Sequence, residues 1–516
     1  MQPQRLLFSC LTLWSLWSAA WTARILLVFP YDFPSQCMLL TPYIRALVER
    51  GHELTLIHAF NNCDVVHEVH AIYAKDRQFK INDWFEHEVT PSISKFGQLA
   101  SLLKYLVKMH LNVLEDPQVQ QLMRSGVSYD LFIIEPSYTD ALFGLAAHFN
   151  ATAMGLATCG ADWNMDGLVG YKSSSALETI SSSISFKPDA GLLDQLYNWM
   201  QISEEWLLQQ LIFLPQLRSV HTHFFGHLAQ SFEQNRQSFS LILLNQHFSL
   251  FESRANVPGM VEVGGMHVPK QLPALAPQLA RFIAEAEHGV VYISLGNELQ
   301  SKDLSAKTLQ VLLHTFESLP QRVIWRFETE ATPNASSNIY FGQWLPQQAI
   351  LAHPNLRLFI NHGGMLSIIE AAHYGKPMLG LPLFFDQARN VERLVLEGTA
   401  LSLDINALTK HSFDHALRQL LCQPQYRLRA QALSQRVRDV PLHPLDSAIY
   451  WTEYVLRYKG AAHMRVSSAN IKLTDYYCLD HLLIIFVRFG LIFLLVVYIL
   501  FKLKSYSHRH IYFGLN

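Results

Sequence analysis

The segment from 344 to 387 contains residue types and spacings that could bind a sugar diphosphate. An apolar run, LRLFI, predicts a buried strand, and His362, Gly363 and Gly364 follow it closely. The glycines would let the backbone approach a ligand, and the stretch from Met365 predicts a helix. Because a helix N-terminus presents free N–H groups and a positive dipole end, this turn predicts a diphosphate site to which His362 could add one donor.

Other polar residues of the same segment suit the remaining parts of a nucleotide sugar. Glu370 lies about two turns into the predicted helix, where its carboxylate could accept a ribose hydroxyl. Trp344 could offer a flat face to a base, although a lone tryptophan is more often a core residue. Asp386 and Gln387 follow the end of the next predicted strand, which is the usual ligand edge of an open α/β sheet.

The elements that would position these residues alternate between strands and helices. Residues 24–30 form a short apolar run, a helical stretch follows from about Cys37 to Glu49, and a second strand begins after Gly51. A similar series starts near residue 288. This pattern predicts an α/β protein with two Rossmann-like domains.

Both ends of the chain carry apolar segments of the kind that direct proteins to membranes. The first 23 residues have the layout of a cleaved signal peptide. Twenty residues at 482–501, apolar except for Arg488, predict a transmembrane helix, and the basic residues after it place the tail in the cytosol. The expected parts are therefore a signal peptide (1–23), a first domain (24–255), a second domain (256–440), C-terminal helices and a linker (441–480), a transmembrane helix (481–501) and a cytosolic tail (502–516).

Glycosylation sequons at Asn150 and Asn334 agree with a lumenal body, although such triplets also arise by chance. We therefore expect a single-pass type I protein of the endoplasmic reticulum membrane. The tail carries no obvious retention signal, so the plasma membrane stays open as an alternative.

Composition excludes several classes of function. The formal net charge of −2 provides no basic field for nucleic acid. The six cysteines lack CxxC spacing, so the sequence indicates neither a disulfide scaffold nor a zinc site. His223 and His227 could share a helix face, but no carboxylate or cysteine at a good spacing joins them, and the chain contains no DxD motif. We therefore expect no bound metal.

Taken together, the motifs RILLVFP, GHELTLI, VGGMH, SLGN and the 344–387 segment resemble the UDP-glucuronosyltransferase family, and most closely its insect UDP-glycosyltransferase branch. The resemblance covers nearly the whole chain. It implies a GT-B fold with the acceptor domain first and the UDP-sugar domain second, and transfer of a hexose, with inversion, to small lipophilic acceptors. It implies no cofactor, and it favours UDP-glucose over UDP-glucuronate as the co-substrate.

The resemblance also implies a donor-binding role for a set of residues in the second domain. These are Trp344 on uracil, Leu345 through its backbone, Gln347 and Glu370 on ribose, His362, Gly364, Ser367 and Asn297 on the diphosphate, and Asp386 and Gln387 on the sugar hydroxyls. Asn297 replaces the usual serine, and Leu366 replaces the asparagine of many members.

On the acceptor side, the family's catalytic histidine position is occupied by Gln36, and its acidic partner corresponds to Glu135. Glutamine cannot accept a proton at neutral pH. Three hypotheses follow. Glu135 acts as the base, directly or through water; the acceptor is an amine or an acidic phenol that needs little deprotonation; or the chain binds UDP-sugars or lipophiles without turnover. Asp32 is a more distant candidate base.

Two runs, 101–114 and 204–214, are amphipathic or mostly apolar. They predict core or acceptor-pocket helices, with contact to a membrane surface as the alternative. A homo-oligomer is a further expectation.

Overall fold

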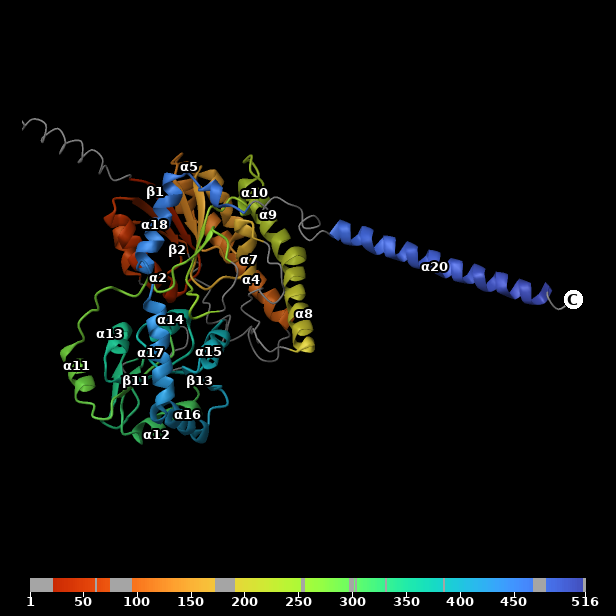
Figure 1. Ribbon diagram of the computed structural model, residues 1–516. Helices are drawn as coiled ribbons and strands as arrows, with labels where there is room; N and C mark the ends of the chain where they lie inside the picture. Colours follow the sequence, from red (N-terminus) through yellow and green to blue (C-terminus); the bar gives the residue numbers. More distant parts are fainter. Residues whose placement is uncertain are drawn as a thin grey trace, which may run out of the picture. The chain divides into compact units, whose positions relative to one another are not determined.

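Alternating strands and helices build two parallel sheets in the body of the chain (Figure 1). In the computed structural model, Met1–Arg465 form one compact unit and Val466–Asn516 form a second. The residues that the structure describes are 22–60, 63–74, 95–171, 191–251, 256–296, 301, 304–329, 332–383, 386–466 and 479–513.

The first sheet has seven strands in the order β3-β2-β1-β4-β5-β6-β7, all parallel. Its central strands are buried on both faces, which is why they read as continuous apolar runs. The strands are β1 (Arg24–Phe29), β2 (Glu53–His58), β3 (His70–Tyr73), β4 (Leu131–Ile134), β5 (Thr152–Ala157), β6 (Ile242–Leu244) and β7 (Met260–Glu262). The sheet extends past the boundary expected at 255, because β7 pairs with β6.

Helices pack on both faces of this sheet, α2 on one face and α4 and α9 on the other. Pro34 opens α2, and Gly51 ends it at φ +86°, a left-handed conformation that favours glycine. The helices are α2 (Pro34–Glu49), α4 (Lys95–Glu115), α5 (Pro117–Arg124), α6 (Gly144–His148), α7 (Trp163–Asp166), α8 (Leu192–Leu208), α9 (Leu214–Phe225) and α10 (Phe232–Arg236). The α8 helix exposes a row of large apolar side chains, including Leu192 and Trp199.

The second sheet has six parallel strands in the order β10-β9-β8-β11-β12-β13. The strands are β8 (Val290–Ser294), β9 (Arg322–Arg326), β10 (Ile339–Gly342), β11 (Leu356–Asn361), β12 (Met378–Gly380) and β13 (Ala400–Ser402). The helices are α11 (Pro277–Ala284), α12 (Ala306–Glu317), α13 (Gln347–Ala352), α14 (Met365–His373), α15 (Gln387–Leu396), α16 (Lys410–Cys422) and α17 (Pro424–Arg438). The two Rossmann-like halves confirm the predicted fold.

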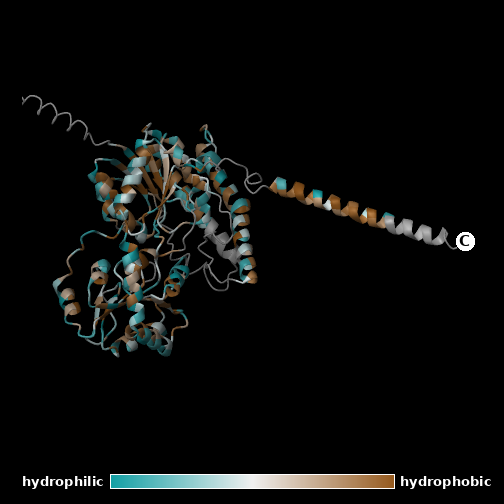
Figure 2. Cartoon of the chain, in the orientation of Figure 1, coloured by the Kyte–Doolittle hydropathy of each residue, from teal (hydrophilic) through white to brown (hydrophobic). Residues whose placement is uncertain are grey.

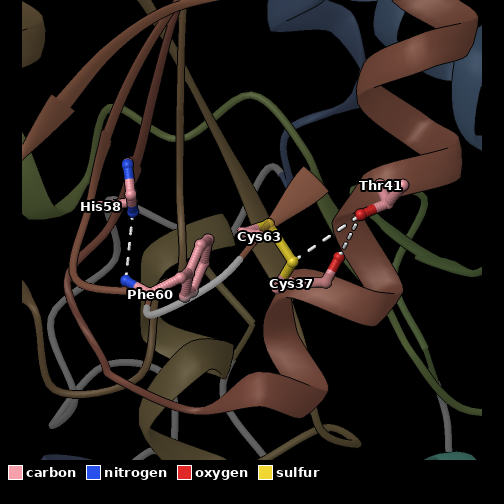
Figure 3. The surroundings of a disulfide bond; sticks show 5 residues. All are labelled: Cys37, Thr41, His58, Phe60 and Cys63. Atoms are coloured by element: carbon pink, nitrogen blue, oxygen red, sulfur yellow. Dashed lines mark hydrogen bonds between the residues drawn. A yellow bond between two sulfur atoms is a disulfide. The ribbon is translucent and has the colours of Figure 1, made fainter. Parts of the chain in front are cut away.

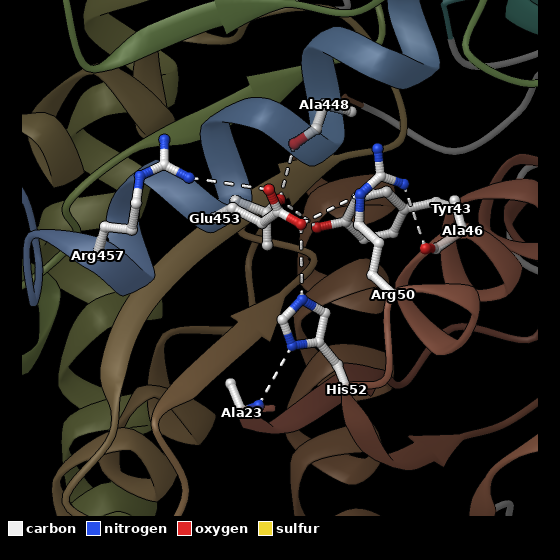
Figure 4. A network of polar contacts seen from close by, with 9 residues as sticks. Ala23, Tyr43, Ala46, Arg50, His52, Ala448, Glu453 and Arg457 are labelled. Atoms are coloured by element: carbon white, nitrogen blue, oxygen red, sulfur yellow. Dashed lines mark hydrogen bonds and ion pairs between the residues drawn. The ribbon is translucent and has the colours of Figure 1, made fainter. Parts of the chain in front are cut away.

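After α17 the chain returns to the first half, where α18 (Pro444–Arg457) packs on α2. Figure 4 shows the polar contacts at this junction. The Glu453 carboxylate forms ion pairs with the side chains of Arg50 and Arg457, and His52 Nε2 lies 3.8 Å from Glu453 Oε1. The hydroxyls of Tyr43 and Thr452 lie 2.6 Å apart and are buried. These contacts attach the end of the second half to the first.

The second unit contains one long helix, α20 (Leu479–Phe513). Its stretch from His481 to Lys502, with a mean hydropathy of 2.9, is long and apolar enough to cross a membrane. In Figure 2 most of this stretch has the colour of hydrophobic residues. The predicted signal peptide lies almost wholly outside the described residues.

One expectation about the cysteines is wrong, because Cys37 and Cys63 form a disulfide (Figure 3). It joins the first turn of α2 to the loop after β2, with the Cα atoms 6.0 Å apart. The two cysteines are 26 residues apart in sequence, so no local spacing marks the pair. They meet only because α2 and the end of β2 come together in the fold.

Candidate active site

A cavity of about 1520 Å³ is lined by both halves of the body. Nearly all of the predicted site residues line it. They are Gln36, Glu135, Trp344, Leu345, Gln347, His362, Gly364, Ser367, Glu370, Asp386 and Gln387. Asn297 lies outside the described residues, and Asn150 and Asn334 are exposed on the surface of the body. The cavity therefore brings the predicted donor residues and both acceptor-side residues into one space.

The imidazole of His362 fits in its place only because residues 296 and 364 are glycines. A Cβ at Gly296 would lie 2.5 Å from its Cε1 atom, and one at Gly364 would lie 2.4 Å from its Nε2 atom. Burial, with the positive charge of Arg326 nearby, lowers the pKa of His362 to about 4, so the ring is neutral at pH 7. Its buried Nδ1 has no partner among the described residues. The ring therefore retains hydrogen-bonding capacity.

The N-terminus of α14 is available to an anion. Gly364 stands at the N-cap and has no side chain with which to cap the helix. The preceding turn is fixed, because Gly363 has φ +88° and donates its N–H to Asn361 Oδ1 at 2.6 Å. A free first turn beside a neutral imidazole can hold a diphosphate through N–H groups and the helix dipole.

Gln347 forms hydrogen bonds with three residues, two of which belong to α14. Its Nε2 donates to Glu370 Oε2 at 2.7 Å and to Ser367 Oγ at 3.1 Å. Its Oε1 accepts from the Tyr292 hydroxyl at 3.2 Å. Gln347 therefore holds Ser367 and Glu370 in place, in addition to lining the cavity itself.

Trp344 is a surface platform and not a core residue. It is 66% exposed, whereas its neighbour Leu345 is buried in the hydrophobic core of the second half. The guanidinium of Arg326 lies 4.9 Å from the centre of the indole ring and also lines the cavity. An indole ring held by a cation–π contact can stack on a planar base.

Asp386 and Gln387 lie at the start of α15, on the same edge of the sheet as the HGG turn. Asn390 Nδ2 connects Asp386 to the HGG turn, since it donates to Asp386 Oδ2 at 2.9 Å and to the Gly363 carbonyl at 3.1 Å. Gln387 Oε1 accepts from the Leu383 N–H at 3.0 Å. An acid and an amide fixed in this way can bind hydroxyl groups.

Across the cavity, Glu135 is buried just after β4 and is held by donors from two loops. Its carboxylate accepts from the Ser137 hydroxyl at 2.7 Å and from the Thr158 N–H at 2.8 Å. Burial raises the pKa of Glu135, and these hydrogen bonds oppose that rise. A buried carboxylate with a raised pKa can serve as a general base.

Gln36 is positioned by the first turn of α2 and presents an acceptor atom. Its Nε2 donates to Thr158 Oγ1 at 3.1 Å, and its side chain is buried. Its buried Oε1 has no partner among the described residues. The amide orientation leaves the carbonyl oxygen available for a hydrogen bond from a ligand.

Much of the remaining acceptor wall is aromatic or apolar, with a few charged side chains such as Glu205. The residues that supply it are Tyr31, Phe33, Tyr105, Tyr138, Trp163, Leu208 and Phe213. Such a lining suits a flat or lipophilic molecule. The predicted run 204–214 therefore contributes to the pocket, at the junction of α8 and the π-helical turn Gln209–Phe213.

Sequence reasoning missed four residues of this site: Ser137, Thr158, His267 and Arg326. Ser137 and Thr158 hold Glu135 and Gln36, but single hydroxyl residues in loops give no signal of their own. His267 belongs to the quoted motif VGGMH, so that motif included it without indicating a role, whereas Arg326 is the last residue of β9 and belongs to none of the quoted motifs.

Within the described part of the chain, no group of three histidine, cysteine or acidic residues could hold a metal ion. His223 and His227 line a smaller hollow with His148.

Comparison with known proteins agrees with this geometry. Residues 24–513 match the family model described as UDP-glucoronosyl and UDP-glucosyl transferase. The chain is 32% identical to UDP-glycosyltransferase UGT5 of Dactylopius coccus, with 92% of this chain and 90% of that protein covered. It is 30% identical to UDP-glucosyltransferase 2 of the same insect, with 92% of each covered. It is 27% identical to UDP-glucuronosyltransferase 2B15 of Homo sapiens, with 88% of each covered.

Among solved structures, the fold is similar to CalG4, the calicheamicin glycosyltransferase, with a TM-score of 0.58 at 17% identity. The match covers 85% of this chain and 99% of that one, and it confirms the GT-B arrangement. The comparisons give no support to the alternative of a non-catalytic binder. The chain belongs to the family of UDP-glucuronosyl and UDP-glucosyl transferases, and it is a UDP-glycosyltransferase of GT-B fold.

Proposed function

We propose that this enzyme transfers glucose from UDP-glucose to small lipophilic acceptors, with inversion at the anomeric carbon. The observation that supports this most is the shared cavity, which holds a helix tip and His362 for a diphosphate on one side and Glu135 and Gln36 on the other. The residues assigned to uracil, ribose and sugar are those of the family pattern, and their roles in this chain are part of the proposal.

The preference for glucose over glucuronic acid is supported by the relatives. The relative named as a glucosyltransferase is 30% identical to this chain, whereas the human glucuronosyltransferase is 27% identical.

In the proposed reaction, the acceptor oxygen or nitrogen attacks the anomeric carbon while the bond from that carbon to the UDP oxygen breaks. UDP leaves with the bonding electrons, and the N–H groups of the α14 N-terminus and His362 stabilise the negative charge that it carries. The proton of the acceptor passes to Glu135, and Gln36 Oε1 orients the acceptor by accepting its hydrogen bond. Because Gln36 cannot take the proton itself, phenols and amines are favoured over less acidic aliphatic alcohols.

We further propose that the body lies in the lumen of the endoplasmic reticulum, with α20 as a single type I span. Asn150 and Asn334 are exposed, as glycosylation requires. The Cys37–Cys63 disulfide also suits an oxidising compartment.

The test is turnover by microsomes that contain the protein. UDP release should follow addition of UDP-glucose with a panel of phenols and aromatic amines, and UDP-glucuronate should give less. Trp344→Ala and Asp386→Ala should each remove most of the activity. Unchanged turnover in both variants would refute the donor-site assignment, and faster turnover with UDP-glucuronate would refute the choice of sugar.

A further inference from the structure

Thr158 contacts both of the polar residues that are assigned to the acceptor. It follows β5, and Glu135 follows the neighbouring parallel strand β4, so both lie at the carboxyl edge of the first sheet. The Thr158 N–H donates to Glu135 Oε2 at 2.8 Å, and Thr158 Oγ1 accepts from Gln36 Nε2 at 3.1 Å. One residue therefore holds Glu135 through its backbone and Gln36 through its side chain.

The backbone of Thr158 is itself fixed by the residue that follows the next strand, β6. The Thr158 carbonyl oxygen accepts from Asn245 Nδ2 at 2.9 Å, and Asn245 is fully buried. The Asn245 N–H also donates to the Ala157 carbonyl oxygen at 3.1 Å. A substitution of the Thr158 side chain should therefore remove the hydrogen bond with Gln36 and leave the backbone hydrogen bond with Glu135 in place.

The hydrogen bond with Thr158 sets the direction in which the Gln36 amide points. A primary amide has donors on its nitrogen and acceptor positions on its oxygen, so its two ends are not equivalent. Nε2 is bonded to Thr158, whereas Oε1 is buried without a partner among the described residues. The Gln36 side chain is buried and lines the cavity. A ligand that forms a hydrogen bond with Oε1 must therefore supply the donor.

Glu135 places a carboxylate beside this amide oxygen, because both residues are bonded to Thr158 and line the cavity. A phenol or an amine can donate a hydrogen bond to either group. A carboxylic acid is ionised at neutral pH, so it has no donor and carries the same charge as an ionised Glu135. The two groups together therefore favour acceptors that present a hydrogen-bond donor.

We propose that Thr158 is a positioning residue, which holds the Gln36 amide with Oε1 toward the acceptor, so that the site takes phenols and amines and excludes carboxylic acids. The inference rests on the proposed function, because it assumes that the acceptor lies at Gln36 and Glu135. The lack of a basic group at position 36 does not explain this exclusion, since a carboxylate needs no base. Without the Thr158 hydroxyl, Nε2 loses its partner, and the amide can turn its donor end toward the ligand.

The test compares two compounds with the same ring system, 2-naphthol and 2-naphthoate. Their affinities for the full-length enzyme saturated with UDP are measured by calorimetric titration. The wild type should bind 2-naphthol roughly 5- to 100-fold more tightly, because 2-naphthoate leaves the buried amide oxygen without a donor.

Substitutions at Thr158 and Gln36 test whether the hydroxyl acts through the amide. In Thr158→Val, which keeps the branched shape without the hydroxyl, the ratio of the two affinities should fall several-fold. Thr158→Ser keeps a hydroxyl and should retain most of the ratio. Gln36→Leu should also lower the ratio, and the addition of Thr158→Val to Gln36→Leu should change it no further. The affinity for UDP should stay constant in all of these variants.

Thr55→Val is the matched control, because the Thr55 hydroxyl also accepts from a side-chain donor, the Tyr129 hydroxyl at 2.9 Å. Thr55 is buried on β2 and is not one of the residues that line the cavity. Thr55→Val should leave the ratio of the two affinities unchanged.

Three results separate the possible failures. Equal affinity of the wild type for the two compounds would overturn the inference, whereas UDP release from UDP-glucose with 2-naphthol would still support the proposed function. An unchanged ratio in Thr158→Val, or a further loss when it is added to Gln36→Leu, would overturn the role of Thr158. No UDP release with any phenol or amine would refute the proposed function and the inference together.

Discussion

The two sides of the cavity are built in different ways. The donor side draws mostly on one continuous segment, in which a strand, a glycine turn and a helix carry His362 and Glu370, and Asp386 follows the next strand. The acceptor side collects Gln36, Glu135 and an aromatic wall from helices and loops far apart in the chain. Recognition of the nucleotide sugar is thus encoded largely in one segment, whereas recognition of the acceptor depends on how distant elements meet. Changes on one side should therefore leave the other side's ligand largely unaffected.

The largest expected effect separates chemistry from donor binding. Glu135→Gln removes the proposed base but keeps a side chain of the same size. General base catalysis contributes about 10²–10⁴-fold, so kcat should fall by that order while the affinity for UDP stays constant. Steady-state kinetics and UDP inhibition measure the two quantities. A parallel loss of UDP affinity would mean that the two sides are not independent.

The second prediction adds an imidazole as a further base on the acceptor side, where Glu135 is the proposed base. Gln36→His places an imidazole where the amide oxygen has no partner among the described residues. Turnover of an aliphatic alcohol should rise about tenfold or more, whereas an acidic phenol or an aromatic amine should gain much less. The ratio of kcat/KM for the two acceptor classes is the measurement. Equal gains for both classes would contradict the idea that Gln36 selects acceptors that need little deprotonation.

The third prediction concerns the disulfide, which closes a loop on the acceptor side only. Cys37→Ser with Cys63→Ser should lower the free energy of unfolding by about 3 kcal/mol, as expected for a loop of this size. Thermal melting of the variant and of the reduced wild type should agree. The KM for the acceptor should change more than the KM for UDP-glucose, because Cys37 adjoins Gln36 in α2. A larger change in the donor KM would contradict the assignment of this helix to the acceptor side.

The last prediction is a pH dependence of stability. Burial lowers the pKa of His362, of His58 and of His373 to about 4, below the usual value of 6.5. The unfolded chain therefore binds more protons than the folded one between about pH 6.5 and pH 4, and stability falls as pH falls through that window. Melting temperatures across this range measure it. His58→Gln should flatten the slope without changing UDP affinity, and an unchanged slope would contradict the burial argument.

Much of the donor side was predictable from sequence. The strand ends at Asn361 and the helix runs from Met365 to His373, as its residue pattern predicted. These features are local, because a glycine turn between an apolar strand and a helix has few alternatives.

What sequence could not supply is contact between distant segments. The Cys37–Cys63 pair, the Thr158 bridge between Gln36 and Glu135, and the reach of His267 to Glu370 all join different elements. Each depends on the packing of one element on another and leaves no periodic or spacing signal.

The central claim is that one pocket binds the uridine diphosphate part of the donor, and calorimetric titration of the purified enzyme with UDP tests it most directly. The wild type should bind one UDP per chain. Trp344→Ala should weaken binding by roughly 5- to 100-fold, as expected for loss of a base stacked on an aromatic ring, and Trp344→Phe should recover most of the affinity. Equal UDP affinity in the wild type and in Trp344→Ala would contradict the account.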